Sequence, residues 1–201
     1  MTGSGSRPVV GVVGLGNMGA PIAERLQHAA GPVWVYDLAP ERAEAVLAQG
    51  GRRATSPQAL GDLVDVVFLS LPSPAAIEAV LFGDRGLADG GRVSTVVDLS
   101  TTGVAESESI ASGLASRGIA LVDCPVSGGV AGARSGALAL MLAGESESVG
   151  RISGLLEHLG TTYQVGSRPG QGQAMKLLNN CLLYTSPSPR DRTRSRMPSS
   201  A

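Results

Sequence analysis

Short apolar runs alternate with stretches of helical spacing along most of the chain, and this alternation constrains the fold more than any other feature. The apolar runs are expected to be strands: Val9–Val13, Val33–Asp37, Val64–Ser70, Val93–Leu99, Ile119–Asp123, Leu138–Ala143 and Thr161–Val165. The stretches between them carry apolar residues at i, i+3 and i+4 and are expected to be helices: Met18–Gln27, Pro40–Gln49, Ala75–Leu81, Ala105–Ser116 and Glu147–Leu159. Continuously apolar strands are typical of burial on both faces, and alternation with helices indicates parallel pairing. The sequence therefore predicts an α/β fold with a doubly wound, mostly parallel sheet.

The first expected strand runs directly into a glycine-rich loop, Gly14-Leu15-Gly16-Asn17-Met18-Gly19. In a dinucleotide-binding loop with this spacing, Gly14 permits the tight turn and Gly16 lets the backbone approach a pyrophosphate. Gly19 lets the following helix pack closely on the strand, and the N–H groups of that helix face the phosphates. A glycine turn that serves structure alone is the alternative. The strand before the loop and the helix after it favour a Rossmann-like NAD(P)-binding domain.

Asp37 ends the second expected strand, eighteen residues after Gly19. A carboxylate at this distance accepts hydrogen bonds from the adenosine ribose hydroxyls and repels a 2′-phosphate, which favours NAD over NADP. Arg42 follows closely and keeps NADP open as a cofactor, although a solvated helix face also accounts for it. The alternative for Asp37 is a solvated residue at a strand end.

Composition excludes several classes of protein. A net charge of −1 gives no strong attraction to nucleic acid or to an anionic membrane. No apolar run is long enough to span a bilayer, and Met1–Arg7 has no apolar signal core. The two cysteines, Cys124 and Cys181, form no disulfide framework or metal-ligand pattern, so no metal is expected. We expect a cytoplasmic protein.

Several motifs occur in the order typical of one enzyme family. The glycine loop extends through Ala20-Pro21, and further matches follow at Leu71-Pro72, Asp98-Leu99-Ser100-Thr101, Asp123-Cys124-Pro125-Val126-Ser127-Gly128-Gly129 with Gly132-Ala133, Gly166 with Gly170-Gln171-Gly172, and Lys176-Leu177-Leu178-Asn179-Asn180. With these motifs the chain resembles the β-hydroxyacid dehydrogenases, a family that includes 3-hydroxyisobutyrate dehydrogenase and tartronate semialdehyde reductase. The resemblance spans nearly all of residues 9–180.

The resemblance implies cofactor contacts at Leu71, Pro72 and Thr101, with Thr101 on the nicotinamide side. Taken alone, Leu71-Pro72 would be an ordinary strand end, and Ser100-Thr101 would be a cap for the next helix. Relatives often carry a polar residue where this chain has Ala76, which removes one cofactor contact.

The resemblance also implies a substrate loop and a catalytic pair. Ser127, Gly128 and Gly129 would hold a substrate carboxylate through a hydroxyl and bare amides, although a flexible turn would look the same.

Lys176 and Asn180 lie four residues apart, so on a helix they share a face. In the family the lysine stands beside the carbonyl being reduced, where it stabilises developing charge and transfers the proton. Asn180 would orient the lysine or the substrate. A lone helical lysine is otherwise ordinary solvated surface.

These implications predict an NAD(P)-dependent oxidoreductase for a small 3-hydroxy acid or semialdehyde, a substrate with a carboxylate. In 6-phosphogluconate dehydrogenase a histidine stands where this chain has Asn179, and imine reductases replace the lysine at Lys176. A non-catalytic dinucleotide-binding or reader module is the alternative from another class. The retained Ser127, Lys176 and Asn180 argue against it.

The end of the chain departs from the pattern. Cys181–Ala201 resembles translated sequencing-adapter DNA, and residues 185–201, rich in Ser, Pro and Arg, are expected to be a disordered, non-native tail; a natural basic tail is the alternative. We expect residues 1–8 to be disordered, 9–166 to be the cofactor domain, and 167–184 to begin an inter-domain helix.

The family's all-α second domain, which follows that helix, is expected to be missing. The intact parent would then be a homo-oligomer, and this fragment would be inactive and not oligomerise in that way. A helix beginning near Met175 would expose Leu177, Leu178, Leu182 and Leu183.

Overall fold

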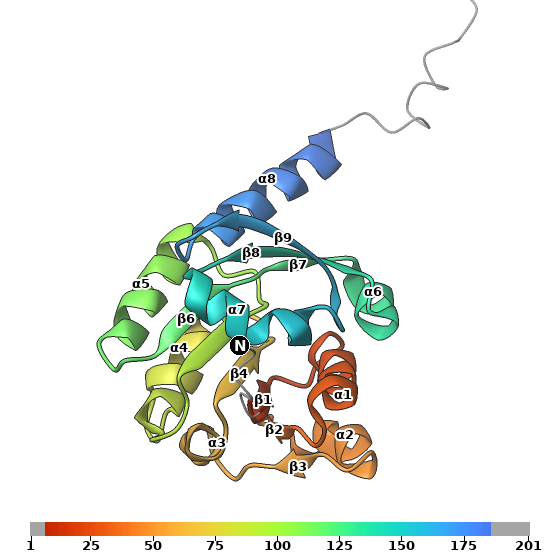
Figure 1. Cartoon of the computed structure of the whole chain (residues 1–201), viewed down its shortest axis with the longest axis vertical. Helices are drawn as coiled ribbons and strands as arrows, with labels where there is room; N and C mark the ends of the chain where they lie inside the picture. Colours follow the sequence, from red (N-terminus) through yellow and green to blue (C-terminus); the bar gives the residue numbers. More distant parts are fainter. Residues whose placement is uncertain (1–6, 186–201) are drawn as a thin grey trace, which may run out of the picture.

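The computed structural model describes residues 7–185, with side chains as far as Leu182. Within these residues nine strands form one sheet: β1 (Val10–Val13), β2 (Trp34–Tyr36), β3 (Arg52–Arg53), β4 (Val66–Leu69), β5 (Thr95–Asp98), β6 (Ala120–Asp123), β7 (Val126–Ser127), β8 (Leu138–Ala143) and β9 (Gly160–Gly166). The α-helices are α1 (Gly19–Ala30), α2 (Glu44–Ala48), α3 (Pro57–Leu63), α4 (Pro74–Phe82), α5 (Val104–Ala115), α6 (Gly129–Ser135), α7 (Ser146–Leu156) and α8 (Gln171–Thr185). Two 3₁₀ turns, Pro40–Ala43 and Leu87–Asp89, complete the described elements (Figure 1).

The strand order is β3-β2-β1-β4-β5-β6-β8-β7, with β9 paired to β8. The first six strands in this order are parallel, and the chain reverses its winding direction between β1 and β4. Open α/β sheets bind ligands at such a switch point, beyond the carboxyl ends of the strands. The topology therefore places the candidate site at the ends of β1, β4, β5 and β6.

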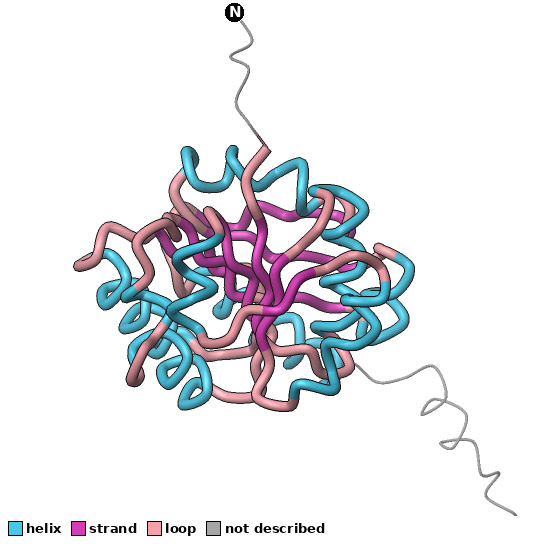
Figure 2. The backbone as a smooth tube through the Cα atoms, turned by 90° about the horizontal axis from the view of Figure 1, so that it is seen from below, coloured by secondary structure: helices cyan, strands magenta, loops and turns pink. Residues whose placement is uncertain are grey.

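The sheet is covered on both faces, as the continuously apolar strands predict (Figure 2). Successive residues of β4 face opposite sides, so Val66 and Phe68 pack under α1, α2, α6 and α7, whereas Val67 and Leu69 pack under α3, α4 and α5. This arrangement confirms the predicted doubly wound, mostly parallel fold.

The sheet departs from the expected parallel pairing at one side. β8 lies antiparallel to both β6 and β7, and parallel to β9. The chain returns from β6 to β8 through only the short β7 and α6, without a crossover helix of full length. A parallel connection needs about a dozen residues or more and usually a helix packed on the sheet.

All the expected helices and strands occur, with ends shifted by a few residues, but Pro40–Gln49 is divided into a 3₁₀ turn and the short α2. The short elements β3, α3, β7 and α6 were not predicted. β3 is an exposed pair of arginines at the sheet edge, which has no apolar pattern. The start of α3 did carry a signal, because the Ser56 hydroxyl accepts a hydrogen bond from the N–H of Ala59 and Pro57 occupies the first turn.

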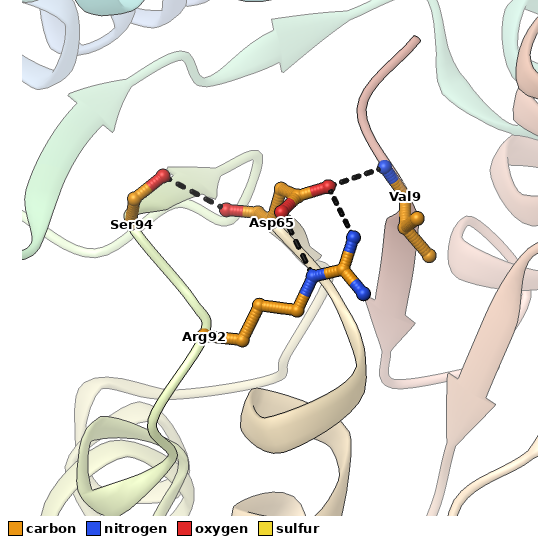
Figure 3. Close-up of polar contacts among 4 residues, drawn as sticks. All are labelled: Val9, Asp65, Arg92 and Ser94. Carbon is orange, nitrogen blue, oxygen red and sulfur yellow. Dashed lines mark hydrogen bonds and ion pairs between the residues drawn. The ribbon is translucent and has the colours of Figure 1, made fainter. Parts of the chain in front are cut away.

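Asp65 links the amino ends of three strands, at the end of the sheet opposite the candidate site (Figure 3). Its carboxylate accepts hydrogen bonds from the Val9 N–H at 2.7 Å and from two nitrogens of Arg92 at 2.9 and 3.0 Å. The Ser94 hydroxyl donates to the backbone carbonyl oxygen of Asp65 at 3.3 Å. The Arg92 guanidinium holds the pKa of this carboxyl below its usual range. Asp65 thus joins the segments that lead into β1, β4 and β5.

The last described helix, α8, touches the sheet only at its beginning and then runs away from it (Figure 1). Gly172 and Gln173 are buried, and no later residue of the described side chains is. Leu177, Leu178 and Leu182 are 51%, 54% and 57% exposed, which confirms their expected exposure; the Leu183 side chain lies outside the described residues. The helix begins at Gln171, before the expected Met175, and Asp123 caps this start by accepting from the N–H of Gly170, just before the helix, and of Gln173 in its first turn.

Two expectations about the chain ends lie largely outside the described residues. Residues 1–6 and 186–201 are not described. At the C-terminal end, α8 continues through Thr185, one residue into the segment expected to be disordered. Among the described helices, none has the length and apolar character needed to cross a bilayer.

Candidate dinucleotide and substrate site

The glycine loop has the geometry that its spacing predicts. Gly14 has a φ of 86°, and a Cβ there would collide with the backbone oxygen of Ser70 on the neighbouring strand end. A Cβ on Gly19 would collide with the carbonyl of Gly14, so only glycine lets α1 begin this close to β1. A Cβ on Gly16 would meet nothing within 4 Å, because this residue faces a cavity. The loop is therefore closed on the protein side and open on the ligand side.

Asp37 ties the loop to the end of β2. Its carboxylate accepts hydrogen bonds from the Leu15 N–H at 2.6 Å and from the Ala39 N–H at 2.8 Å. Its side chain is only 7% exposed, yet it lines the cavity. Arg42 also lines this cavity, with its guanidinium 3.7 Å from the Asp37 carboxylate. Each carboxylate oxygen has a second lone pair, so Asp37 can hold the loop and still accept a hydrogen bond from a ligand.

A cavity of about 730 Å³ lies over the carboxyl ends of β1, β2 and β4. Among the predicted cofactor residues, those that line it are Gly14, Gly16, Asn17, Met18, Asp37, Leu71 and Pro72. Leu15 and Gly19 are buried beneath it. Ala76 also lines this cavity, and its N–H donates to the Ser73 hydroxyl at the start of α4.

A second cavity, of about 370 Å³, lies over the carboxyl ends of β4 and β5 and beside β7. Its walls include the predicted Thr101, Ser127, Gly128, Gly129 and Lys176, which come from three separate segments. Met18, Ser70 and Leu71 line both cavities, which therefore adjoin. The sequence motifs for cofactor and for substrate thus meet at one place.

The local structure bears on two alternatives, a helix cap at Ser100-Thr101 and a flexible turn at Ser127-Gly128-Gly129. Ser100 and Thr101 do not cap α5, because its N-terminal cap is Gly103 and no side chain bonds there. Instead, the Ser100 hydroxyl accepts a hydrogen bond from the Leu71 N–H at 3.0 Å, which joins the two strand ends that form the floor of the site. Gly128 follows β7 and Gly129 begins α6, with φ of 128° and 61°, so the segment is a strand-to-helix turn that needs glycine at both positions.

Lys176 projects from the second turn of α8 and is half-buried at the smaller cavity. Burial lowers the pKa of its ammonium group. A lysine with a lowered pKa exchanges protons more readily near neutral pH than one in open solvent. Asn180, its expected partner, is half-buried but is not among the described residues that line either cavity.

Three residues at the base of the site were assigned no role in the prediction: Asp98, Asp123 and Gln173. Asp98 and Asp123 end β5 and β6, stand opposite each other in the register, and are both buried. Burial raises the pKa of both carboxyls. A detectable signal was present, because each acid ends an apolar strand at the sheet edge where ligands bind. Gln173 carried no such signal.

Among the described residues, no group of three or more His, Cys, Asp or Glu could hold a metal ion.

Strand order, glycine loop and joined cavities define a Rossmann-type dinucleotide-binding domain. Residues 9–166 match the family described as the NAD binding domain of 6-phosphogluconate dehydrogenase, and the chain belongs to this family.

The named relatives include 3-hydroxyisobutyrate dehydrogenases. The chain is 36% identical over 177 residues to a 3-hydroxyisobutyrate dehydrogenase of Pseudomonas aeruginosa, a match that covers 87% of this chain and 59% of that protein. A solved structure of Mycobacterium tuberculosis 3-hydroxyisobutyrate dehydrogenase with L-serine is 32% identical, with a TM-score of 0.81, covering 88% of this chain and 60% of that one. The structure of Psf3 in complex with NADP+ and 2-OPP is 36% identical, with a TM-score of 0.79, covering 86% and 61%. The chain thus spans about 60% of the length of these relatives.

Proposed function

We propose that this chain supplies the cofactor-binding domain and the acid–base lysine of an NAD(P)-dependent oxidoreductase. Residues 9–166 would form that domain, and 167–184 would begin the helix leading to a second domain. The proposed reaction transfers a hydride between the cofactor and a small 3-hydroxy acid or semialdehyde. The observation that carries the proposal is the meeting of the two cavities at Met18, Ser70 and Leu71. The named relatives support the substrate class.

The described residues fit a dinucleotide. Both cavity volumes, about 370 and 730 Å³, fall within the range of about 300–1,000 Å³ that is typical of small-molecule sites. The open side of Gly16 would admit the pyrophosphate, and Asp37 would accept hydrogen bonds from the adenosine ribose. Asp37 favours NAD, whereas Arg42 beside it could pair with the 2′-phosphate of NADP. We propose NAD as the preferred cofactor.

The chemistry that a bound nicotinamide supplies is hydride transfer to or from the substrate carbon. The chain's own residues would bind the substrate and transfer the proton. Ser127, Gly128 and Gly129 line this cavity and would offer it a hydroxyl and backbone amides, which suit a carboxylate. In the reducing direction the Lys176 ammonium donates a proton to the oxygen that gains charge. In the oxidising direction the neutral amine accepts the hydroxyl proton. The lowered pKa of Lys176 makes both forms accessible.

We further propose that the 201-residue chain alone does not turn over substrate. Lys176 is only half-buried, and α8 leaves the described body after its first turn. Hydride transfer of this kind needs a site from which water is excluded. The remaining part of the relatives, about 40% of their length, would supply that closure.

The test joins this chain, within α8, to the carboxy-terminal part of the Pseudomonas relative. We expect the 201-residue chain to oxidise 3-hydroxyisobutyrate with NAD+ at no more than background rate and the fusion to oxidise it measurably, followed by NADH absorbance. Substantial turnover by the 201-residue chain would overturn the inactivity. A folded fusion that binds NADH and turns over no 3-hydroxy acid would favour the non-catalytic alternative.

A further inference from the structure

We infer that Gln173 and Asp123 are positioning residues that hold Lys176 at the smaller cavity by fixing the first turn of α8 to the ends of β5 and β6. The importance of this role for catalysis rests on the proposed function. The placement itself does not, because it follows from hydrogen bonds and burial among the described residues.

Gln173 is the centre of the arrangement, and it is only 1% exposed. Its Nε2 donates to the Asp123 carboxylate at 2.8 Å and to the Ser100 carbonyl at 3.1 Å. Its Oε1 accepts from the N–H groups of Thr102 at 3.0 Å and Gly103 at 3.3 Å. A glutamine amide has two N–H donors and two acceptor lone pairs, so all four are used. The amide has one orientation only, because a reversed amide would place its oxygen against a carboxylate and a carbonyl.

Asp123 fixes the start of the same helix. Its Oδ2 accepts from the backbone N–H of Gly170 at 2.9 Å and of Gln173 at 3.1 Å. A Cβ on Gly172 would lie 2.9 Å from this carboxylate and 2.6 Å from the Met141 carbonyl, so the helix packs as closely as its backbone permits. These contacts anchor both the axial position and the rotation of the first turn.

The anchored turn links the segments that form the smaller cavity. Ser100 precedes Thr101, Asp123 precedes the Ser127 loop, and Gln173 precedes Lys176 by three residues, nearly one helical turn. Asp98, at the end of β5, holds the segment that follows this strand. Its carboxylate accepts hydrogen bonds from the Ser100 N–H at 2.9 Å and from the Thr102 hydroxyl at 2.6 Å.

Beyond Gln173 no described side chain of α8 is buried, so no other contact of comparable burial sets where Lys176 points. The direction of the Lys176 side chain therefore depends on this single buried turn. Loss of the Gln173 amide would remove a partner from the Asp123 carboxylate, the Ser100 carbonyl and the Thr102 N–H, all in buried residues, which favours separation of the helix from the strand ends.

Lys176 is the only lysine in the 201 residues, which gives a specific probe. With ¹³Cε-lysine incorporated into the full chain, one NMR signal reports the environment and the pKa of Lys176. In Gln173→Met, which retains the shape but loses the amide, we expect this signal to move to the position of a solvent-exposed lysine. We expect its pKa to rise toward that of a solvent-exposed lysine.

Gln171→Met is the matched control, since Gln171 lies in the same turn but is exposed, and its side chain accepts from the N–H groups of Ser167 and Arg168 outside the helix. Its Lys176 signal should stay at the wild-type position. A folded Gln173→Met with an unchanged Lys176 signal and pKa would overturn the inference, as would an equal displacement in both variants.

Gln173→Glu keeps the test decisive should Gln173→Met fail to fold. At neutral pH a glutamate here would face Asp123 directly, with Asp98 beside it, and could not donate. Protonated by acid, it regains one donor and one acceptor. We expect the Lys176 signal to return toward its wild-type position on acidification, relative to the wild-type titration; a difference from wild type that does not change with pH would contradict the inference. No cofactor or substrate is needed, so this result is independent of whether the proposed function holds.

Discussion

Replacing Asp37 with alanine is expected to weaken NADH binding about 30-fold and to remove the preference for NADH over NADPH. The carboxylate is the acceptor at the adenosine end of the larger cavity, and a hydrogen bond to a charged group contributes about 2 kcal/mol. Its charge also opposes the 2′-phosphate of NADPH. Calorimetric titration of both cofactors into the wild type and the variant measures both effects.

Two controls separate ribose binding from damage to the loop. Asp37→Asn retains an acceptor for the Leu15 N–H but removes the charge, so it should lose discrimination while it loses less NADH affinity than Asp37→Ala. Arg42→Ala should weaken NADPH more than NADH, because its guanidinium lines the same cavity. Unchanged NADH affinity in Asp37→Ala would show that the ribose does not bind there.

Replacing Lys176 with methionine should lower kcat about 10²- to 10⁴-fold in the fusion with the Pseudomonas carboxy-terminal part, the usual contribution of general acid–base catalysis. Methionine retains much of the side-chain volume but cannot transfer a proton. NADH affinity should change far less than kcat, since Lys176 meets only the nicotinamide end of the dinucleotide and does not line the larger cavity. The measurement is steady-state oxidation of 3-hydroxyisobutyrate, with NADH binding measured in parallel.

The pH dependence of the same reaction provides a second criterion. In the oxidising direction the neutral amine is required, so activity should rise with pH through the lowered pKa of Lys176. The variant should lose this rise along with the rate. A variant with wild-type kcat and pH profile would exclude Lys176 as the acid–base group.

The fold was predictable because its signals are local. The apolar runs that became β1, β4 and β5 are buried on both faces, and the loop from Gly14 to Gly19 has the spacing that the turn requires. The antiparallel β8 was not predictable, since its run of apolar residues looks the same in either direction. The exposed β3 had no pattern to detect.

The candidate site was predictable only in part, for a physical reason. Motif residues such as Ser127 and Lys176 could be named from the sequence, and both line one cavity. The role of Gln173 could not be, because it depends on the tertiary register that places Asp98 beside Asp123. Asn180 was expected from helical spacing to join Lys176, but it does not line the cavity on the described part of the chain.

The most direct test of the central claim, that one dinucleotide spans both cavities, follows the single Lys176 signal during titration. NADH should shift this signal in a saturable way, because its nicotinamide half would reach the smaller cavity. Adenosine monophosphate, which can fill only the Asp37 end, should bind and leave the signal unmoved. A folded chain that binds NADH without any change at Lys176 would contradict the claim that the two cavities form one site.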